Sequence, residues 1–290
     1  MSLDPVVAHL LCVALVALDQ LVRAVRIRLL TGALGHPLGF RDAIAANAIG
    51  DTASAVTPMR IGGEPARLAS FLRFGVPATA SFVAQAFEVI TQWPMVILSA
   101  VGLGVWFAPG WLAQTAPLLF AGLRRAWIIL ALLGAISLVA WLLVRRVVHV
   151  APRMTRRPWR RVRVYGRRLP PRVLVASALL GFLNVVARVA ILPVLLAAFP
   201  DPPPLGPAIL GSFALVYSQL ALPTPSGAGV VDLGLLAGAA GSTGQSGVAI
   251  LVWWRFYSTF AGVAIGAWFA LETFGWRAIK GAISRLSRRP

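Results

Sequence analysis

Long apolar runs, some of them broken by proline and glycine, restrict the fold of this chain more than any other feature. The uninterrupted runs lie at about 5–30, 76–106, 124–148, 171–199 and 246–273. A helix needs about 20 apolar residues to cross a bilayer core of roughly 30 Å. Of the 290 residues, 58% are hydrophobic and 12% are charged, whereas soluble domains have about 45–50% apolar residues. We therefore predict an all-α polytopic membrane protein, with residues 1–290 forming one transmembrane domain.

Basic residues gather in two segments and predict the orientation. The formal net charge is +18, and eleven arginines lie within 145–172. The C-terminal segment after Trp276 is also basic. Because basic loops stay in the cytoplasm, we expect both segments to be cytoplasmic and the N-terminus to lie outside. Arg23, Arg26 and Arg28 come after the apolar residues from Pro5 to Leu18, whereas a signal peptide carries basic residues before its apolar stretch. We therefore expect a retained first helix with a cytoplasmic basic end.

Two further segments, 40–74 and 208–240, are apolar but broken. The residues that break them are Pro58, Gly62, Gly63, Pro223, Pro225, Gly227 and Gly229. Proline removes a backbone donor and glycine permits tight turns. Broken backbone persists at membrane depth only inside protein or beside a water-filled cavity. We predict two re-entrant helical hairpins in addition to about five full transmembrane helices. The alternative is seven to nine simple spans with kinks.

A shift of 167 residues superposes the two breaks. Thr57-Pro58 falls on Thr224-Pro225, and Gly62 falls on Gly229. Three predicted crossings separate the breaks, so the second unit is expected to be inverted relative to the first. Inverted repeats with discontinuous helices are a transporter design. The predicted repeats cover about 40–106 and about 205–273, and the arginine-rich loop at 145–172 lies between them.

Several charged residues fall at membrane depth, where they indicate function by default. Glu88 and Arg255 lie deep in the helices after the two hairpins, and we hypothesise that they form or share a polar centre. The alternative is a static ion pair that fixes helix register. Forked arginine donors match phosphate, so Arg60 and Arg67 are expected to form a cationic mouth. The expected substrate-binding residues are Asp51, Arg60, Glu64, Arg67, Glu88, Arg188, Asp232 and Arg255.

The remaining chemistry-bearing side chains give no catalytic pattern. Cys12 is the only cysteine, which excludes an intramolecular disulfide and a cysteine cluster for metal. His9, His36 and His149 are far apart and lack metal-ligand spacing. We therefore expect no catalytic residue, no metal and no cofactor. The arginine-rich loop is expected to sit on anionic headgroups, with no nucleic acid as a partner.

The two broken segments resemble motifs of the transmembrane region of the lysylphosphatidylglycerol synthase/flippase family. The first motif is PMRIGGEPAR from Pro58 to Arg67, followed by a glutamate in the next helix, here Glu88. The second is PTPSGAGVVD from Pro223 to Asp232, and the resemblance covers about 40–270. The sequence also departs from the family pattern. The departures are Ser226 in place of a glycine, Asp232 in place of the usual glutamate and Gln92 in place of a frequent aspartate.

The resemblance implies lipid translocation, flippase- or scramblase-like, in the cytoplasmic membrane of a bacterium or archaeon. The family's soluble aminoacyl-transferase domain is absent from this sequence. The expected partners are anionic, aminoacylated or polyprenyl-phosphate lipids, and a homo-oligomer is left open. One alternative is a membrane enzyme acting on a lipid-linked substrate, with Asp51 or Glu88 as a base. The other is an accessory membrane protein whose buried charges are structural.

Overall fold

The computed structural model describes residues 3–109, 164–166, 169–199, 202–220, 222, 224–239 and 247–286. Within these ranges the chain is helical and forms no strand beyond one isolated bridge. The helices are α1 (Pro5–Ala33), α2 (Phe40–Val56), α3 (Gly63–Arg73), α4 (Ala78–Phe107), α7 (Pro171–Leu196), α8 (Leu205–Ser218), α9 (Val230–Ala239), α10 (Gly247–Arg255), the π-helical turn η2 (Phe256–Phe260) and α11 (Ala261–Leu286). The predicted all-α polytopic fold class is confirmed.

Four helices among the described residues are long and apolar enough to cross a membrane. They are α1, α4, α7 and the continuous stretch Gly247–Gly275, which joins α10, η2 and the first part of α11. These match four of the five predicted runs. The fifth run, 124–148, lies outside the described residues, as does most of the loop at 145–172.

The two broken segments each form two short helices. Helices α2, α3, α8 and α9 contain 17, 11, 14 and 10 residues. At about 1.5 Å per residue, none of them reaches the roughly 30 Å needed to cross the bilayer core. Helix α2 ends where Thr57 is extended, because a residue before proline avoids the helical region. The predicted breaks at Pro58 and Pro225 therefore lie between helices.

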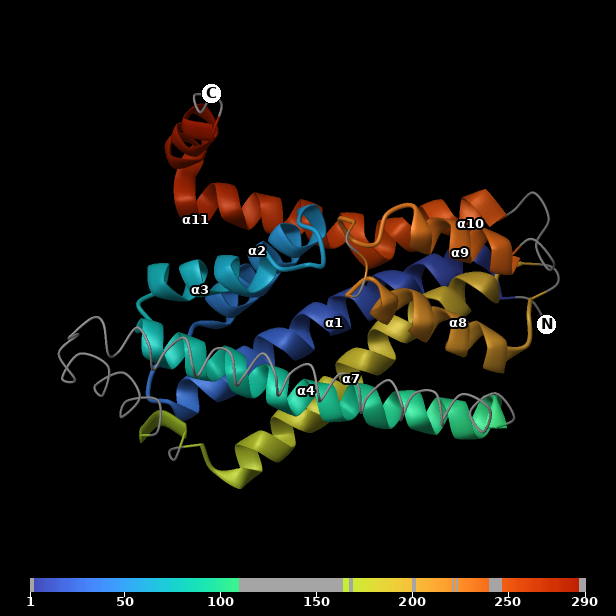
Figure 1. Cartoon of the computed structure of the whole chain (residues 1–290), viewed down its shortest axis with the longest axis horizontal. Coiled ribbons are helices and arrows are strands. Elements are labelled where there is room, and N and C mark those ends of the chain that lie inside the picture. Colours follow the sequence, from blue (N-terminus) through green and yellow to red (C-terminus); the bar gives the residue numbers. More distant parts are fainter. Residues whose placement is uncertain are drawn as a thin grey trace, which may run out of the picture.

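The two helix pairs occupy opposite ends of the molecule, and their connecting turns meet between them (Figure 1). Contacts in the first half of the protein, α1 to α4, recur in the second half, α7 to α11. Helix α1 packs on α2 as α7 packs on α8, and α3 packs on α4 as α9 packs on α10. The last long helix of each half reaches across to the other half, with α11 on α2 and α4 on α8. Helices α1 and α7 pack along each other at the centre.

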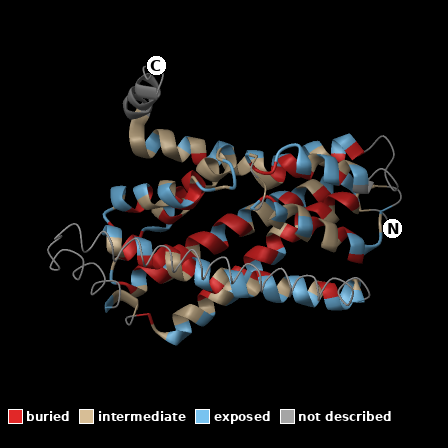
Figure 2. Cartoon of the chain, in the orientation of Figure 1, coloured by how far each residue is buried: buried red, intermediate tan, exposed pale blue. Residues whose placement is uncertain are grey.

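Buried residues concentrate on the facing sides of the long helices, especially α1 and α7 (Figure 2). Many large apolar side chains point outward instead, among them Leu10, Trp106, Leu233 and Trp268. An apolar exterior of this extent is typical of a surface that faces lipid. Polar groups are therefore expected to face the interior of the bundle.

Contrary to the prediction from the sequence, two arginines of α1 do not mark the cytoplasmic end of this helix. Arg23 and Arg26 were expected to mark the cytoplasmic end of the first helix. Both are buried, and Arg26 is only 1% exposed. Because they point into the protein, the preference of loop arginines for the cytoplasm does not apply to them. Their place in the sequence therefore says nothing about which end of α1 is cytoplasmic.

Candidate functional site

The two breaks have the same turn geometry. The N–H of Arg60 donates to the carbonyl of Thr57 at 3.2 Å, and the N–H of Gly227 donates to that of Thr224 at 3.1 Å. The following residue in each turn donates to the carbonyl of Pro58 or Pro225. These two prolines form an isolated antiparallel bridge with each other. The bridge therefore joins positions that the 167-residue shift makes equivalent.

Both turns contain two consecutive residues with left-handed backbone. Met59 and Arg60 have φ of 51° and 59°, and the equivalent Ser226 and Gly227 have φ of 48° and 67°. Glycine adopts this conformation readily, whereas a residue with a side chain loses roughly 1–2 kcal/mol. Three of the four positions therefore store strain, and the contact between the turns helps to hold them there.

The second turn is tied to both halves of the protein. The hydroxyl of Ser226 donates to the carbonyl of Ala55 at 3.2 Å, and its own carbonyl accepts from Nη1 of Arg255 at 2.9 Å. Nε of Arg255 also donates to Asp232 at 2.6 Å. Asp232 accepts the N–H of Gly229 at 2.9 Å, which caps the start of α9. Asp232 thus both caps a helix and neutralises Arg255.

The first half has a corresponding ion pair, but there the hairpin helix carries the arginine and the long helix carries the carboxylate. Arg67 on α3 forms an ion pair with Glu88 on α4 and a longer one, at 3.4 Å, with Glu64. Glu88 and Arg255 do not pair with each other, so the alternative of a static ion pair between them is wrong. Each of these charges finds its partner within its own half, because the second helix of each hairpin packs on the long helix that follows it.

Arg26 on α1 donates hydrogen bonds to neutral acceptors on α4, close to Glu88. Its guanidinium donates to Ser177 Oγ at 3.3 Å, the carbonyl of Glu88 at 2.8 Å, Thr91 Oγ1 at 3.1 Å and the amide oxygen of Gln92. This cation therefore links α1, α4 and α7. Gln92, which stands where the family often has an aspartate, accepts a hydrogen bond from Arg26 through its amide oxygen.

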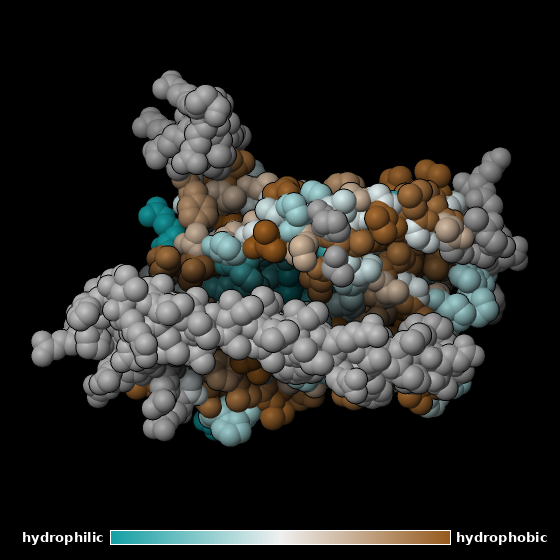
Figure 3. All heavy atoms as spheres, in the orientation of Figure 1, coloured by the Kyte–Doolittle hydropathy of each residue, from teal (hydrophilic) through white to brown (hydrophobic). Residues whose placement is uncertain are grey.

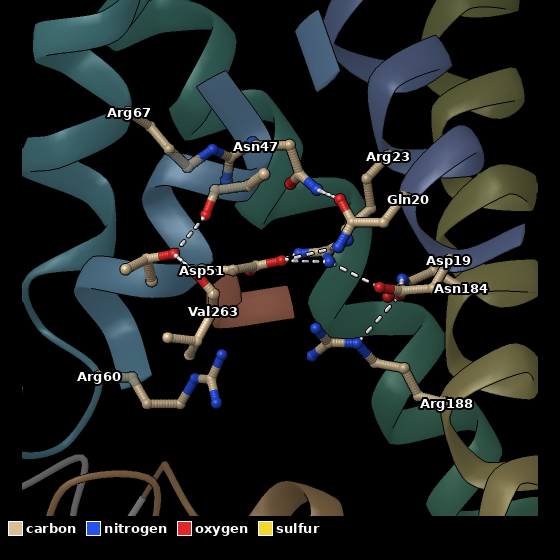
Figure 4. Close-up of polar contacts among 12 residues, drawn as sticks. Asp19, Gln20, Arg23, Asn47, Asp51, Arg60, Arg67, Asn184, Arg188 and Val263 are labelled. Atoms are coloured by element: carbon tan, nitrogen blue, oxygen red, sulfur yellow. Dashed lines mark hydrogen bonds and ion pairs between the residues drawn. The ribbon is translucent and has the colours of Figure 1, made fainter. Parts of the chain in front are cut away.

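A second charged cluster lies between the hairpins (Figure 4). Arg23 donates to Asp19 at 2.6 Å and to Oδ1 of Asp51 at 2.7 Å, and also to Oδ2 of Asp51. Gln20 adds a donor to Asp51 at 3.2 Å. Nε of Arg188 donates to Asp19 at 3.0 Å. The cluster thus connects α1, α2 and α7 by alternating charges.

This cluster lines a polar cavity of about 80 Å³. Arg60 also lines the cavity, as do Tyr217 from α8 and Thr259 from η2. Figure 3 shows hydrophilic residues in a recess, with apolar residues on the surface to either side of it. At roughly 10–15 Å³ per water, the cavity has space for several water molecules or for a group of similar size.

The structure divides the predicted site residues into three groups. Asp51, Arg60 and Arg188 line the cavity. Glu64, Arg67 and Glu88 form one set of ion pairs, and Asp232 and Arg255 form another. Arg67 and Arg255 are thus both neutralised by carboxylates. The predicted break residue Pro223 lies outside the described residues.

Sequence reasoning gave too little weight to α1. Asp19 is not among the expected substrate-binding residues, and Arg23 and Arg26 were expected only to mark the end of the first helix. Their spacing of four and then three residues places all three on one helix face, which was a usable signal. Among the described residues, no three His, Cys, Asp or Glu side chains come together as metal ligands do.

Long apolar helices, two short helix pairs whose turns meet, and a charged cavity between them define a multi-pass integral membrane protein. The family model for the lysylphosphatidylglycerol synthase transmembrane region matches residues 2–266, and the chain belongs to this family. The resemblance inferred from the two motifs is thereby confirmed. No curated protein and no solved structure matches the chain. Family membership places the protein among membrane proteins of lipid metabolism or translocation.

Proposed function

We propose that the protein translocates a lipid across the membrane, with the headgroup passing through the polar cavity between the hairpins. The observation that carries this proposal is the cavity itself, since three arginines and two aspartates line it within an otherwise apolar helical bundle. Charges at membrane depth are costly and mark pathways for polar cargo. The apolar exterior would let the acyl chains remain in the bilayer while the headgroup crosses.

The arrangement of the hairpins supports this route. We propose that α2–α3 and α8–α9 are re-entrant and enter from opposite sides as an inverted repeat. Their helices are too short to cross the bilayer, they lie at opposite ends of the long helices, and their turns meet at the bridge between Pro58 and Pro225 (Figure 1). Small movements of the two turns would then open the cavity to one side or the other.

The charged carboxylates are poorly placed for the enzymatic alternative. A general base takes a proton from its substrate, and a carboxylate that does so leaves the buried arginine it neutralises without a counter-charge. Both oxygens of Asp51 accept from Arg23, and one also accepts from Gln20. Glu88 is held by Arg67. These contacts favour a transporter over an enzyme.

The proposal can be tested by locking the turns together in liposomes. The variant Pro58→Cys/Pro225→Cys in a Cys12→Ser background places two cysteines at the bridge, within the Cα separation that a disulfide spans. Wild-type protein should expose fluorescent phosphatidylglycerol to an external quencher at a rate that rises with protein content. Oxidation of the double cysteine variant should abolish most of that activity, and reduction should restore it.

The single variants Pro58→Cys and Pro225→Cys provide the matched controls, because they cannot form the cross-link within one chain. Wild-type liposomes that expose lipid no faster than protein-free liposomes would contradict the proposal. Product formation from a lipid-linked sugar in the same liposomes would support the enzyme instead. Inactivity in both assays would support an accessory role.

A further inference from the structure

The charges that line the cavity do not balance. Arg23, Arg60 and Arg188 face two carboxylates, Asp19 and Asp51. Arg23 uses its guanidinium on both carboxylates, and Arg188 reaches Asp19 through Nε alone. Counting the described lining residues, the cavity therefore carries one excess positive charge. The other deep charges do not line the cavity. Arg26, Arg67 and Arg255 are balanced by the three carboxylates of Glu64, Glu88 and Asp232.

Arg60 is the cavity arginine without a carboxylate partner among the described residues. Within the described part of the chain, its guanidinium donates to the neutral amide oxygen of Gln219, at 3.3 Å, and to no other group. Its backbone is left-handed, and the equivalent position in the other turn is Gly227. Glycine would remove this strain, so the side chain at position 60 has a use that offsets the cost.

Arg188 approaches the same space from the opposite wall. Figure 4 shows the guanidinium groups of Arg60 and Arg188 facing each other below Asp51. Among the described contacts, Arg188 uses only Nε, so its two terminal NH₂ groups are available. Two cations that face each other in a low dielectric repel. An oxyanion between them would remove this repulsion and accept hydrogen bonds from both forks.

We propose that the cavity binds one singly charged phosphate diester between Arg60 and Arg188. The inference deepens the proposed function and rests on it for the identity of the cargo as a lipid. A diester carries one negative charge, which matches the single excess positive charge of the cavity. A zwitterionic choline headgroup brings its own cation. A lysine ester adds two amino groups and makes the headgroup net positive. The site therefore favours an unmodified anionic phospholipid over its aminoacylated form.

Equilibrium binding to the purified full chain in detergent tests this assignment without requiring transport. The probes are dihexanoyl phosphatidylglycerol, dihexanoyl phosphatidylcholine and glycerophosphoglycerol, which has no acyl chains. Wild-type protein should bind the phosphatidylglycerol at least about tenfold more tightly than the phosphatidylcholine. Arg60→Gln and Arg188→Gln should each weaken that binding roughly 10- to 100-fold, as expected for loss of a charged hydrogen-bond donor pair.

Two further variants separate a binding role from a structural one. Arg60→Lys keeps the charge but loses the fork, so its affinity should lie between those of the wild type and Arg60→Gln. Arg41→Gln removes an exposed arginine outside the cavity and should leave affinity unchanged. Melting temperatures should confirm that each variant is folded. Folded Arg60→Gln that binds like the wild type would overturn the proposal, as would equal affinity for the two short-chain lipids.

The remaining outcomes identify the source of the diester and separate the two proposals. Binding of glycerophosphoglycerol as tightly as the lipid would identify a soluble diester as sufficient. Binding of the lipid alone would identify a membrane headgroup. Both results support the site. Retained binding without translocation in liposomes would leave the site standing and refute the proposed function. Translocation together with equal binding of both short-chain lipids would refute the proposed site and leave the proposed function standing.

Discussion

The two hairpins share a backbone frame but differ in the charges they carry. Their turns have equivalent hydrogen bonds and left-handed residues, and they touch at equivalent prolines. Each second helix is joined to the next long helix by an ion pair, but Arg67–Glu88 in the first half becomes Asp232–Arg255 in the second. Both halves thus place a pair of opposite charges at this junction, but with the polarity reversed.

The turns themselves differ in a way that the fold does not require. Gly227 adopts its left-handed conformation without strain, whereas Arg60 adopts nearly the same φ with a long charged side chain. Since the backbone is satisfied equally in both turns, the difference lies in what the side chain reaches. The first turn supplies a cation to the cavity, and the second supplies the backbone anchor for Arg255.

The largest expected effect comes from breaking the two ion pairs and comparing the losses. In the Arg67–Glu88 pair the side chains are 11% and 10% exposed, whereas Asp232 is 26% exposed. Glu88→Gln leaves the buried Arg67 only its longer pair, at 3.4 Å, with the more exposed Glu64. It should therefore destabilise the fold by about 3 kcal/mol, the lower end of the range for breaking a buried pair. Asp232→Asn should cost less, because water reaches that site.

Unfolding of the purified variants in detergent measures both losses. The double variant Arg67→Gln/Glu88→Gln removes both charges and should recover part of the stability lost in Glu88→Gln. A loss in Asp232→Asn equal to that in Glu88→Gln would mean that burial does not distinguish the two pairs.

The two helix contacts between the halves, α11 with α2 and α4 with α8, should also lose different amounts of stability when a glycine in each is replaced by alanine. A Cβ added at Gly266 on α11 would lie 2.0 Å from the backbone oxygen of Ala48 on α2. At the equivalent contact, a Cβ at Gly206 on α8 meets the ring of Phe107 at 2.6 Å. Gly266→Ala should cost about 1–3 kcal/mol because backbone must move, whereas Gly206→Ala should cost less because a side chain near the end of α4 can shift. Melting temperatures of the two variants, compared directly, test the difference.

Exchanging the turn residues should separate stability from binding. Arg60→Gly relieves the left-handed strain but frees more backbone entropy in the unfolded chain, so stability should stay within about 1 kcal/mol of the wild type. Binding of dihexanoyl phosphatidylglycerol should be lost. Gly227→Ala should instead lower stability, because φ is 67° and the new Cβ would lie 2.6 Å from Val231. A stable Gly227→Ala variant would show that the two turns are not under the same backbone constraint.

The smallest effect is expected at an ion pair outside both hairpin junctions. Arg41 pairs with Glu272, and their side chains are 73% and 43% exposed. Exposed pairs contribute about 0–1 kcal/mol, so Arg41→Gln should leave the unfolding transition and lipid translocation nearly unchanged. A loss of stability as large as that in Glu88→Gln would indicate that this contact between α2 and α11 stabilises the fold more than its exposure predicts.

Local features of the sequence were sufficient to predict the helices and the breaks. Long apolar runs predicted α1, α4, α7 and the stretch from α10 into α11, because the length of such a run is a direct property of the chain. Proline and glycine predicted the two turns for the same reason, since their backbone limits belong to the residues themselves. The 167-residue shift also anticipated which turn residues are equivalent.

The partners of the buried charges could not be predicted in the same way. Glu88 and Arg255 were identified as deep charges, but the sequence does not say which neighbouring helix brings the opposite charge. Arg23 and Arg26 looked like arginines at the end of a span, because an arginine that reaches a headgroup and one that points inward have the same local sequence. The contacts of α1 with α2, α4 and α7 decide between these cases.

The sequence by itself therefore determined a helical membrane protein with two broken helix pairs and a family to which it belongs, because hydropathy, proline and glycine act locally. Only the tertiary structure decided which charges cancel and which remain. Pairing depends on distances between helices that are far apart in the chain, and those distances leave Arg60 and Arg188 facing one cavity with one positive charge in excess.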